Sequence, residues 1–309
     1  MTLIQRDTPF PHWEFTSPEG DQLRVVPERG GLVCGWRCGG SERLYFDAER
    51  FADPAKSVRG GIPVLFPVCG NLPDNRLELP QGRVELPQHG FARDRPWQLQ
   101  ALADGRGIRL ELSDDAITRA SYPFAFRLVL EVRLEPAALA IRALVRHEAA
   151  AASGSAVAGA ASAAMPFALG LHPYVAVADL GGAALEGLPA RCFDHLTAGP
   201  ADTAAQLARL PQGVDLRVER PDPGASSPAA SLPSAPRLLT SFSSPDGSAA
   251  AAAIELQAES PFDHTVIWTD PPRPMVCLEP WTARRGELGL ELAPGEQLEL
   301  NCRYTLMPG

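Results

Sequence analysis

The stretch RLVLEVRL, residues 127–134, shows the pattern that decides the fold. Every second residue from Leu128 to Leu134 is aliphatic, and three of the four residues at the alternate positions are charged. Side chains of a β-strand point to its two faces in turn, so this period of two places one set against a core and the other toward water. The stretch therefore predicts a half-buried β-strand.

The same alternation recurs in residues 108–113 and 297–304. Turn signals stand between such segments, at Asp104-Gly105, Pro245-Asp246-Gly247 and Pro294-Gly295-Glu296. The sequence offers no amphipathic helix of ordinary length, and it contains 27 glycines and 31 prolines. Together these features predict an all-β fold, an antiparallel sandwich or barrel.

Two low-complexity segments interrupt this pattern, residues 149–164 and 221–236. Both are poor in aromatic and large aliphatic side chains, so neither can bury enough surface to offset the entropy of ordering it. The strand pattern resumes in the same style after each. We therefore expect a single β-sandwich domain over residues 1–309 with two loop insertions; a domain linker is the alternative interpretation.

The charge balance limits the choice of partners. With 28 Lys+Arg against 37 Asp+Glu, the formal net charge is −9. We expect no nucleic acid or anionic membrane as a partner, because such surfaces need clustered positive charge. A small anion held by a few arginines stays compatible with the composition.

Localisation follows from what the sequence does not show. It has no apolar run suited to crossing a bilayer and no basic region followed by an apolar one at the start, as a signal peptide has. The six cysteines form neither CxxC pairs nor a Cys/His cluster with zinc spacing. We expect a cytoplasmic protein with free thiols and no metal site, with a disulfide framework as the alternative.

Four short stretches stand out from the strand background. Each sets a polar or charged residue beside glycine or proline among aromatic or large aliphatic residues. This is typical of loops and strand ends that line a pocket, where the backbone comes close and a few polar groups meet an apolar wall. They are VRGGIPVLFPVCG (58–70), QHGFARDRPW (88–97), MPFALGLHPYV (165–175) and MVCLEPWTA (275–283).

Two histidines have similar surroundings in these stretches. His172 precedes Pro173, which restricts it to an extended backbone, and His89 precedes Gly90. The other four histidines lack such surroundings and are interpreted as ordinary. A structural role for His172 or His89 is as consistent with the sequence as a functional one.

Glu279 stands at the end of a predicted strand, residues 275–279, and we expect Pro280 to end that strand by removing a donor. A carboxylate set between leucine, proline and tryptophan is poorly solvated. Desolvation raises its pKa and makes it a better general base. The alternative is a surface glutamate paired with Arg284 or Arg285.

Arginines supply the third group of candidates. Arg59 begins the sequence RGGIP, and Arg93 and Arg95 flank Asp94. A guanidinium group matches a phosphate or carboxylate bidentately. The alternative is an internal ion pair of Arg93 or Arg95 with Asp94 or Asp74.

Taken together and in this order, the four stretches resemble the galactose mutarotase-like family of aldose 1-epimerases. The sequences RGGIP, FP and HGFAR, from Arg59 to Arg93, are most similar to the hexose-6-phosphate 1-epimerase branch. The sequences GLHPY and CLEP match later motifs of the family. The resemblance spans residues 20 to 305 and implies a large antiparallel β-sandwich.

The resemblance also implies a reaction: interconversion of the α and β anomers of a hexose or hexose 6-phosphate without a cofactor. Carried over, Glu279 is the general base and His172 the general acid of ring opening. His89 is then a sugar ligand, and Arg59 and Arg93 hold the phosphate. The partner is a small sugar or sugar phosphate, and the protein is expected to be a monomer or weak dimer.

The family's substrate-binding aspartate is matched less well. Asp263 is the nearest candidate, one residue too far from Trp268, and Asp270 is the other. A non-catalytic carbohydrate-binding sandwich would keep the aromatic and arginine residues without needing Glu279 and His172 together. A glycosidase would need two carboxylates and would leave both histidines without a role.

Overall fold

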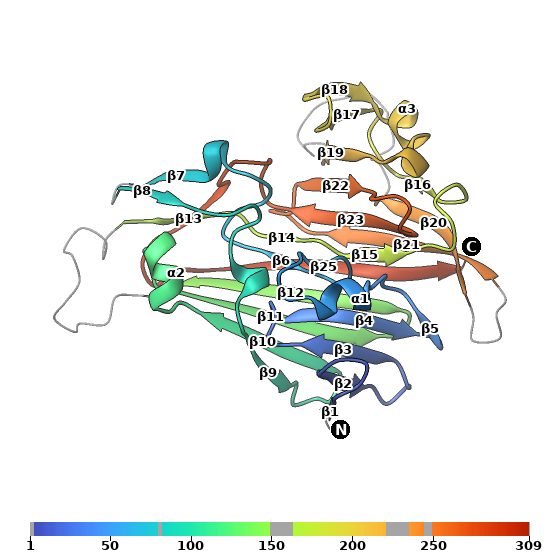
Figure 1. The fold of residues 1–309 in the computed structure, drawn as a ribbon, viewed down its shortest axis with the longest axis horizontal. Coiled ribbons are helices and arrows are strands. Elements are labelled where there is room, and N and C mark those ends of the chain that lie inside the picture. Colours follow the sequence, from blue (N-terminus) through green and yellow to red (C-terminus); the bar gives the residue numbers. More distant parts are fainter. Residues whose placement is uncertain (1–2, 80–81, 149–162, 221–234, 244–248, 309) are drawn as a thin grey trace.

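A computed structural model describes residues 3–79, 82–148, 163–220, 235–243 and 249–308 (Figure 1). Within these residues the chain is built of antiparallel β-sheets, which confirms the predicted all-β fold. The low-complexity segments fall almost entirely outside the described residues, as does the predicted turn at 245–247. The single-domain organisation stays a prediction.

The first large sheet contains the strands that alternation predicted. Residues 127–134 lie in β11, and the segments 108–113 and 297–304 lie in β10 and β25. In spatial order this sheet consists of β16 (Ala184–Glu186), β20 (Arg237–Ser243), β21 (Ala249–Ala258), β25 (Gln297–Pro308), β12 (Ala138–His147), β11 (Phe126–Glu135), β10 (Gly107–Ser113) and β9 (Gln98–Ala101).

The second large sheet carries most of the candidate residues. Its centre is β23, which pairs with β22 along one side and with β14 and β15 along the other. In spatial order it consists of β18 (Gly199–Asp202), β17 (Arg191–Asp194), β19 (Asp215–Glu219), β22 (His264–Trp268), β23 (Met275–Trp281), β14 (Gly170–Leu171) with β15 (Tyr174–Ala176), and β6 (Val64–Leu65).

Smaller elements complete the molecule. A five-stranded sheet contains β1 (Ile4–Arg6), β2 (His12–Thr16), β3 (Gln22–Val26), β4 (Leu32–Cys38) and β5 (Ser41–Glu42), while β7 (Arg76–Leu79) pairs with β8 (Gly82–Glu85) and β13 (Met165–Phe167) with β24 (Leu290–Leu292). The helical elements are α1 (Ala48–Ala52), α2 (Ala116–Ser121), α3 (Thr203–Leu207), η1 (Pro73–Asn75), η2 (Ala92–Asp94) and η3 (Leu210–Gln212). None of these helices has the length and apolar surface that a bilayer crossing requires, as far as the described residues go.

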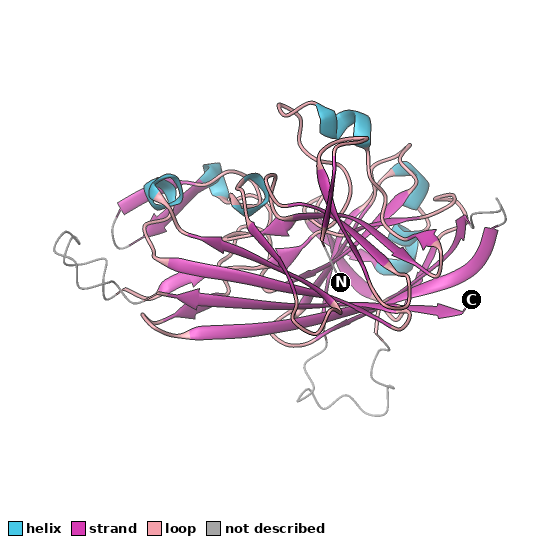
Figure 2. Ribbon diagram, turned by 90° about the horizontal axis from the view of Figure 1, so that it is seen from below, coloured by secondary structure: helices cyan, strands magenta, loops and turns pink. Residues whose placement is uncertain are grey.

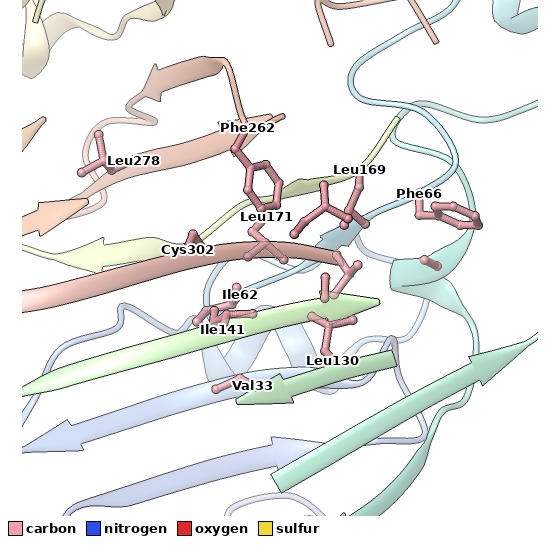
Figure 3. Packing of buried hydrophobic residues seen from close by; sticks show 14 of the residues in the cluster. Val33, Ile62, Phe66, Leu130, Ile141, Leu169, Leu171, Phe262, Leu278 and Cys302 are labelled. Atoms are coloured by element: carbon pink, nitrogen blue, oxygen red, sulfur yellow. The ribbon is translucent and has the colours of Figure 1, made fainter. Parts of the chain in front are cut away.

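The sheets are stacked in layers, with the short helices along one side (Figure 2). One large hydrophobic cluster contains residues from the first, the second and the five-stranded sheet, and Figure 3 shows part of it; smaller clusters lie beside it. Leu130 and Ile141 enter this cluster from the first sheet, Val33 from the five-stranded sheet, and Leu171 and Leu278 from the second. Because Leu278 points into the cluster, its neighbour Glu279 points to the opposite face of β23.

Candidate active site

Strand register gathers the candidate residues on one face of the second sheet. Cys277 of β23 is paired with Trp268 of β22 and with Tyr174 of β15, and Trp268 is paired in turn with Asp215 of β19. Directly opposed residues in antiparallel strands point to the same face. Glu279, two residues beyond Cys277, therefore shares this face with the whole row.

An interruption in the ladder leaves room beside Glu279. Gly170 of β14 is paired with Trp281, and Tyr174 of β15 with Cys277, so His172 lies in the unpaired segment between the two strands. The expectation that Pro280 ends the strand is wrong, because β23 continues to Trp281. Pro280 is paired only with β22, and proline is tolerated where one side of a strand lacks a ladder partner.

Glu279 is one of the most deeply buried charged residues, with 1% of its surface exposed. Its Oε2 accepts a hydrogen bond of 3.0 Å from the indole of Trp281. Burial, with the charge of Asp215 adding to it, raises the pKa of the Glu279 carboxyl well above its ordinary value. The alternative of a surface glutamate paired with Arg284 or Arg285 is wrong, since Glu279 is buried, Arg284 pairs with Glu219 and Arg285 pairs with Asp215.

His172 faces Glu279 across the interruption. Its Nε2 lies 3.4 Å from Oε1 of Glu279, and its ring stacks on Tyr174 with 4.8 Å between centroids. Burial, followed by the charge of Arg93, lowers the pKa of His172 to about 3. Burial thus favours the neutral forms of both groups, an uncharged imidazole beside a protonated carboxyl, and the pair holds one proton in total.

His89 is held by a reciprocal pair of hydrogen bonds with Gly70. The His89 N–H donates to the Gly70 carbonyl at 2.8 Å, and the Gly70 N–H donates to Nδ1 of His89 at 3.0 Å. Burial lowers the pKa of His89 well below its usual value, so the ring is neutral. Because Nδ1 accepts, the ring proton is on Nε2, and His89 can only donate to a ligand from there.

The backbone conformation at His89 explains why a glycine follows this residue. His89 and Gly90 have φ values of 66° and 70°, both left-handed. A Cβ on Gly90 would lie 2.1 Å from the carbonyl oxygen of Phe66, so no side chain fits there. With the backbone in this turn, the centroid of the His89 ring lies 5.8 Å from the ring centroids of His172 and Trp281.

Arg59 and Arg93 both reach the site. Arg59 lies over the ring of Trp268 at 5.5 Å, and its Nε is 3.2 Å from Asp270. Arg93 donates to the Gln88 carbonyl at 2.9 Å. Burial lowers the pKa of Arg93, and the positive charge of Arg59 acts in the same direction, while the negative charge of Asp94 acts to raise it. The charges of Arg93 and Arg59 both act on His172, and each of them lowers its pKa.

Comparison with known proteins gives a family. The family model described as aldose 1-epimerase matches residues 23–200, more than half of the chain. This chain belongs to the aldose 1-epimerase family. The solved structure of the Slr1438 protein from Synechocystis sp. PCC 6803 is 30% identical with a TM-score of 0.80, covering 100% of both chains.

Two further proteins are similar at lower identity or over a shorter stretch. A curated protein of Escherichia coli (strain K12), described as "Putative glucose-6-phosphate 1-epimerase", is 29% identical over 112 residues, 34% of this chain and 34% of that protein. The match thus spans about a third of that relative's length. A galactose mutarotase-like protein from Lactobacillus casei ATCC 334 shares the fold, with 19% identity, a TM-score of 0.65 and coverage of 96% and 99%.

The two aspartate candidates of this family member lie in different places. The Asp263 side chain is 48% exposed. Its carboxylate lies 4.0 Å from Arg220 and accepts a hydrogen bond from the Ser260 hydroxyl, and neither contact reaches the site. Asp270 pairs with Arg59 at the edge of the site. The structure thus brings Asp270, and not Asp263, to the cluster.

Sequence reasoning missed Asp215. Its side chain lies in the row that contains Cys277, and its Oδ2 accepts from Nη2 of Arg285 at 2.7 Å. The segment DLRVE in β19 alternates charged and apolar residues like any half-exposed strand. No local signal marks this aspartate, and only the pairing of β19 with β22 places it beside the site.

Cys277 raises the question of a metal. Its Sγ, Nδ1 or Nε2 of His172 and a carboxylate oxygen of Glu279 lie within 4.8 Å of one another, so this set has the donors for an ion. Burial, with Glu279 adding to it, raises the pKa of the Cys277 thiol well above its ordinary value, which disfavours the thiolate that binds metals. All six cysteines are free, as predicted, and the structure shows in addition that all six are buried.

Proposed function

We propose that this protein is an aldose 1-epimerase that interconverts the α and β anomers of a hexose 6-phosphate. One observation carries the proposal: a buried histidine and a buried glutamate face each other at 3.4 Å, beside two guanidinium groups. Ring opening needs one group that accepts a proton and one that donates, both held at the same sugar.

The one-proton pair of His172 and Glu279 matches this demand. With the proton on His172, the Glu279 carboxylate takes the proton of the anomeric hydroxyl while His172 protonates the ring oxygen. The bond between C1 and the ring oxygen breaks and gives the open-chain aldehyde. After rotation about C1–C2, the ring closes with the proton transfers reversed, and the pair again holds one proton.

The remaining groups bind and orient the sugar in this proposal. Nε2–H of His89 donates to a sugar oxygen, and the Asp215 carboxylate accepts from a sugar hydroxyl. Arg59 and Arg93 hold the phosphate, because a guanidinium group matches a phosphate bidentately. Their partners in the structure are carboxylates, Asp270 at 3.2 Å from Arg59 and Asp94 at 3.7 Å from Arg93. The branch-like motifs and the E. coli relative support a phosphosugar over a free sugar.

The alternative is a non-catalytic sandwich that binds carbohydrate. Such a protein would use the aromatic rings and arginines of the site. It would have no use for a fully buried glutamate, whose desolvation is costly. The burial of Glu279 therefore favours the enzyme.

Anomer exchange measured by NMR tests the proposal. Wild-type protein is compared with Glu279→Gln on glucose 6-phosphate, glucose and galactose. We expect acceleration with glucose 6-phosphate, and a loss of about 10²–10⁴-fold in the variant, because the amide cannot accept the proton. Sugar binding without acceleration in the wild type would favour the non-catalytic sandwich.

Arginine variants separate the phosphate from the sugar in the same assay. Arg93→Gln is expected to slow exchange on glucose 6-phosphate while leaving any activity on free glucose unchanged. Arg95→Gln is the matched control, because Arg95 lies two residues away and pairs with Asp115. Equal losses on both sugars in Arg93→Gln would contradict a phosphate role.

A further inference from the structure

Asp215 is held by a side chain that the proposed reaction does not yet use. The Nδ1 of His195 lies 2.8 Å from Oδ1 of Asp215, while Arg285 donates to Oδ2 at 2.7 Å. Each carboxylate oxygen thus has one donor, and the two donors approach from different elements. This fixes the plane of the carboxylate and leaves further lone pairs on both oxygens for a ligand.

The partners also settle which nitrogen of His195 carries the proton. Burial works to raise the pKa of Asp215, but His195 and Arg285 outweigh burial and leave that pKa below its ordinary value. An ionised carboxylate only accepts hydrogen bonds, so Nδ1 of His195 is the donor.

The chain around His195 is built as a rigid turn. Residues 195–198 connect β17 to β18, and fully buried Asp194 accepts from the Leu196 N–H at 2.8 Å and the Thr197 hydroxyl at 3.0 Å. The His195 N–H donates to the Asp215 carbonyl at 2.8 Å. The His195 side chain is only 5% exposed, although it belongs to a turn at the edge of a sheet. Turn and strand are thus tied together through both backbone and side chain.

Asp215 connects this turn to the reacting groups. It lies in the row of Trp268 and Cys277, and its charge reaches Glu279, where it adds to the effect of burial. A small rotation of the Asp215 carboxylate would turn its free lone pairs away from the sugar hydroxyl that they accept from. A group that prevents this rotation therefore acts on the reaction without touching the sugar.

We propose that His195 is a positioning residue of the epimerase: its Nδ1–H holds the Asp215 carboxylate, together with Arg285, in the orientation that accepts a ring hydroxyl of the sugar. This inference rests on the proposed function. It assigns a role to a histidine that its sequence surroundings did not distinguish, and it makes the β17–β18 turn part of the site.

The first test is a pair of variants at this position. His195→Leu removes the donor, and His195→Asn replaces Nδ1–H by an amide N–H at nearly the same place. We expect His195→Leu to raise KM for glucose 6-phosphate about tenfold with little change in kcat, because a hydrogen bond to a charged group is lost in ground state and transition state alike. His195→Asn is expected to restore most of the affinity.

His147→Leu is the matched control. His147 is a buried histidine in β12 of the first sheet, and its Nδ1 bonds to the Leu292 carbonyl at 2.9 Å. Its replacement is expected to lower the melting temperature without changing KM. If His195→Leu changed only the melting temperature, as His147→Leu should, the inference would be overturned.

A double-mutant cycle decides whether His195 acts through Asp215. In an Asp215→Asn background, His195→Leu is expected to have no further effect on kcat/KM, since the carboxylate that it positions is gone. Independent losses that multiply would overturn the inference and leave the epimerase standing. A wild-type protein that accelerates no sugar would remove the proposed function and this inference together.

Discussion

At the scale of single residues, burial has the largest effect on the chemistry. Glu279 and His172 each have a pKa displaced by burial, upward for the carboxyl and downward for the imidazole. The two groups lie 3.4 Å apart and together hold one proton. That proton is either on Glu279, which makes both groups neutral, or on His172, which makes them an ion pair. The sequence left a desolvated and a surface Glu279 both open, and the family resemblance implied His172 as its partner. The fold shows that Glu279 is buried and lies 3.4 Å from His172.

The pH dependence of kcat/KM follows from this shared proton. Activity requires the form of the pair with one proton, which is lost as pH rises through the raised pKa of Glu279. It is also lost when a second proton is added, as pH falls through the pKa of His172, about 3. We therefore expect the basic limb of the profile well above the ordinary glutamate pKa of 4.5.

The Trp281 indole predicts the direction in which a variant should shift the basic limb. Its hydrogen bond lowers the pKa of Glu279 against burial and Asp215, and Arg285 acts in the same direction. Trp281→Phe should therefore move the basic limb of kcat/KM to higher pH, as measured with glucose 6-phosphate. A limb that moved to lower pH, or did not move, would contradict this assignment of the limb to Glu279.

At the scale of elements, the site depends on departures from regular strands. The segment between β14 and β15 leaves the ladder at His172, and the left-handed turn at His89 and Gly90 brings a second histidine to the same place. The sequence signalled both departures through neighbouring proline and glycine residues. It was wrong about Pro280, because the missing N–H is harmful only where a ladder partner needs it.

Gly90 offers a stability test of this turn. Gly90→Ala must adopt a left-handed φ and place a Cβ 2.1 Å from the Phe66 carbonyl, so we expect a loss of roughly 2 kcal/mol or more in the free energy of unfolding. The control is Gly295→Ala, where φ is 87° but nothing lies within 4 Å of the added Cβ. Urea unfolding midpoints should fall clearly further for Gly90→Ala; equal shifts would mean that the close approach to Phe66 costs nothing.

At the scale of the whole molecule, one hydrophobic cluster joins the sheets. Leu130 of the first sheet and Leu278 of the second belong to the same cluster (Figure 3). This agrees with the expectation of a single domain, which stays a prediction, as does the expected monomer or weak dimer. The stacking matters for the site, since Leu278 in the cluster fixes the strand that carries Glu279.

Unfolding tests the single domain directly. Leu130→Ala and Leu278→Ala should each cost about 2–5 kcal/mol, because each leaves a cavity in a packed core. If the sheets form one unit, each variant lowers the same calorimetric transition, seen equally by tryptophan fluorescence and by far-UV circular dichroism. Two separate transitions, each sensitive to one variant, would show that the sheets unfold independently.

The sequence by itself determined the fold class, because alternation in β10, β11 and β25 is a local property of side chains on a pleated strand. It also marked His89, His172 and Glu279 through the residue that follows each of them, which is Gly90, Pro173 and Pro280. Only the tertiary structure decided that Asp215, Arg285 and His195 meet beside them and that Asp263 does not. Such residues lie in ordinary strands and turns, and their meeting depends on which distant strands pair, as β19 does with β22 and β22 with β23. Pairing between distant segments is not visible in any one stretch of the sequence.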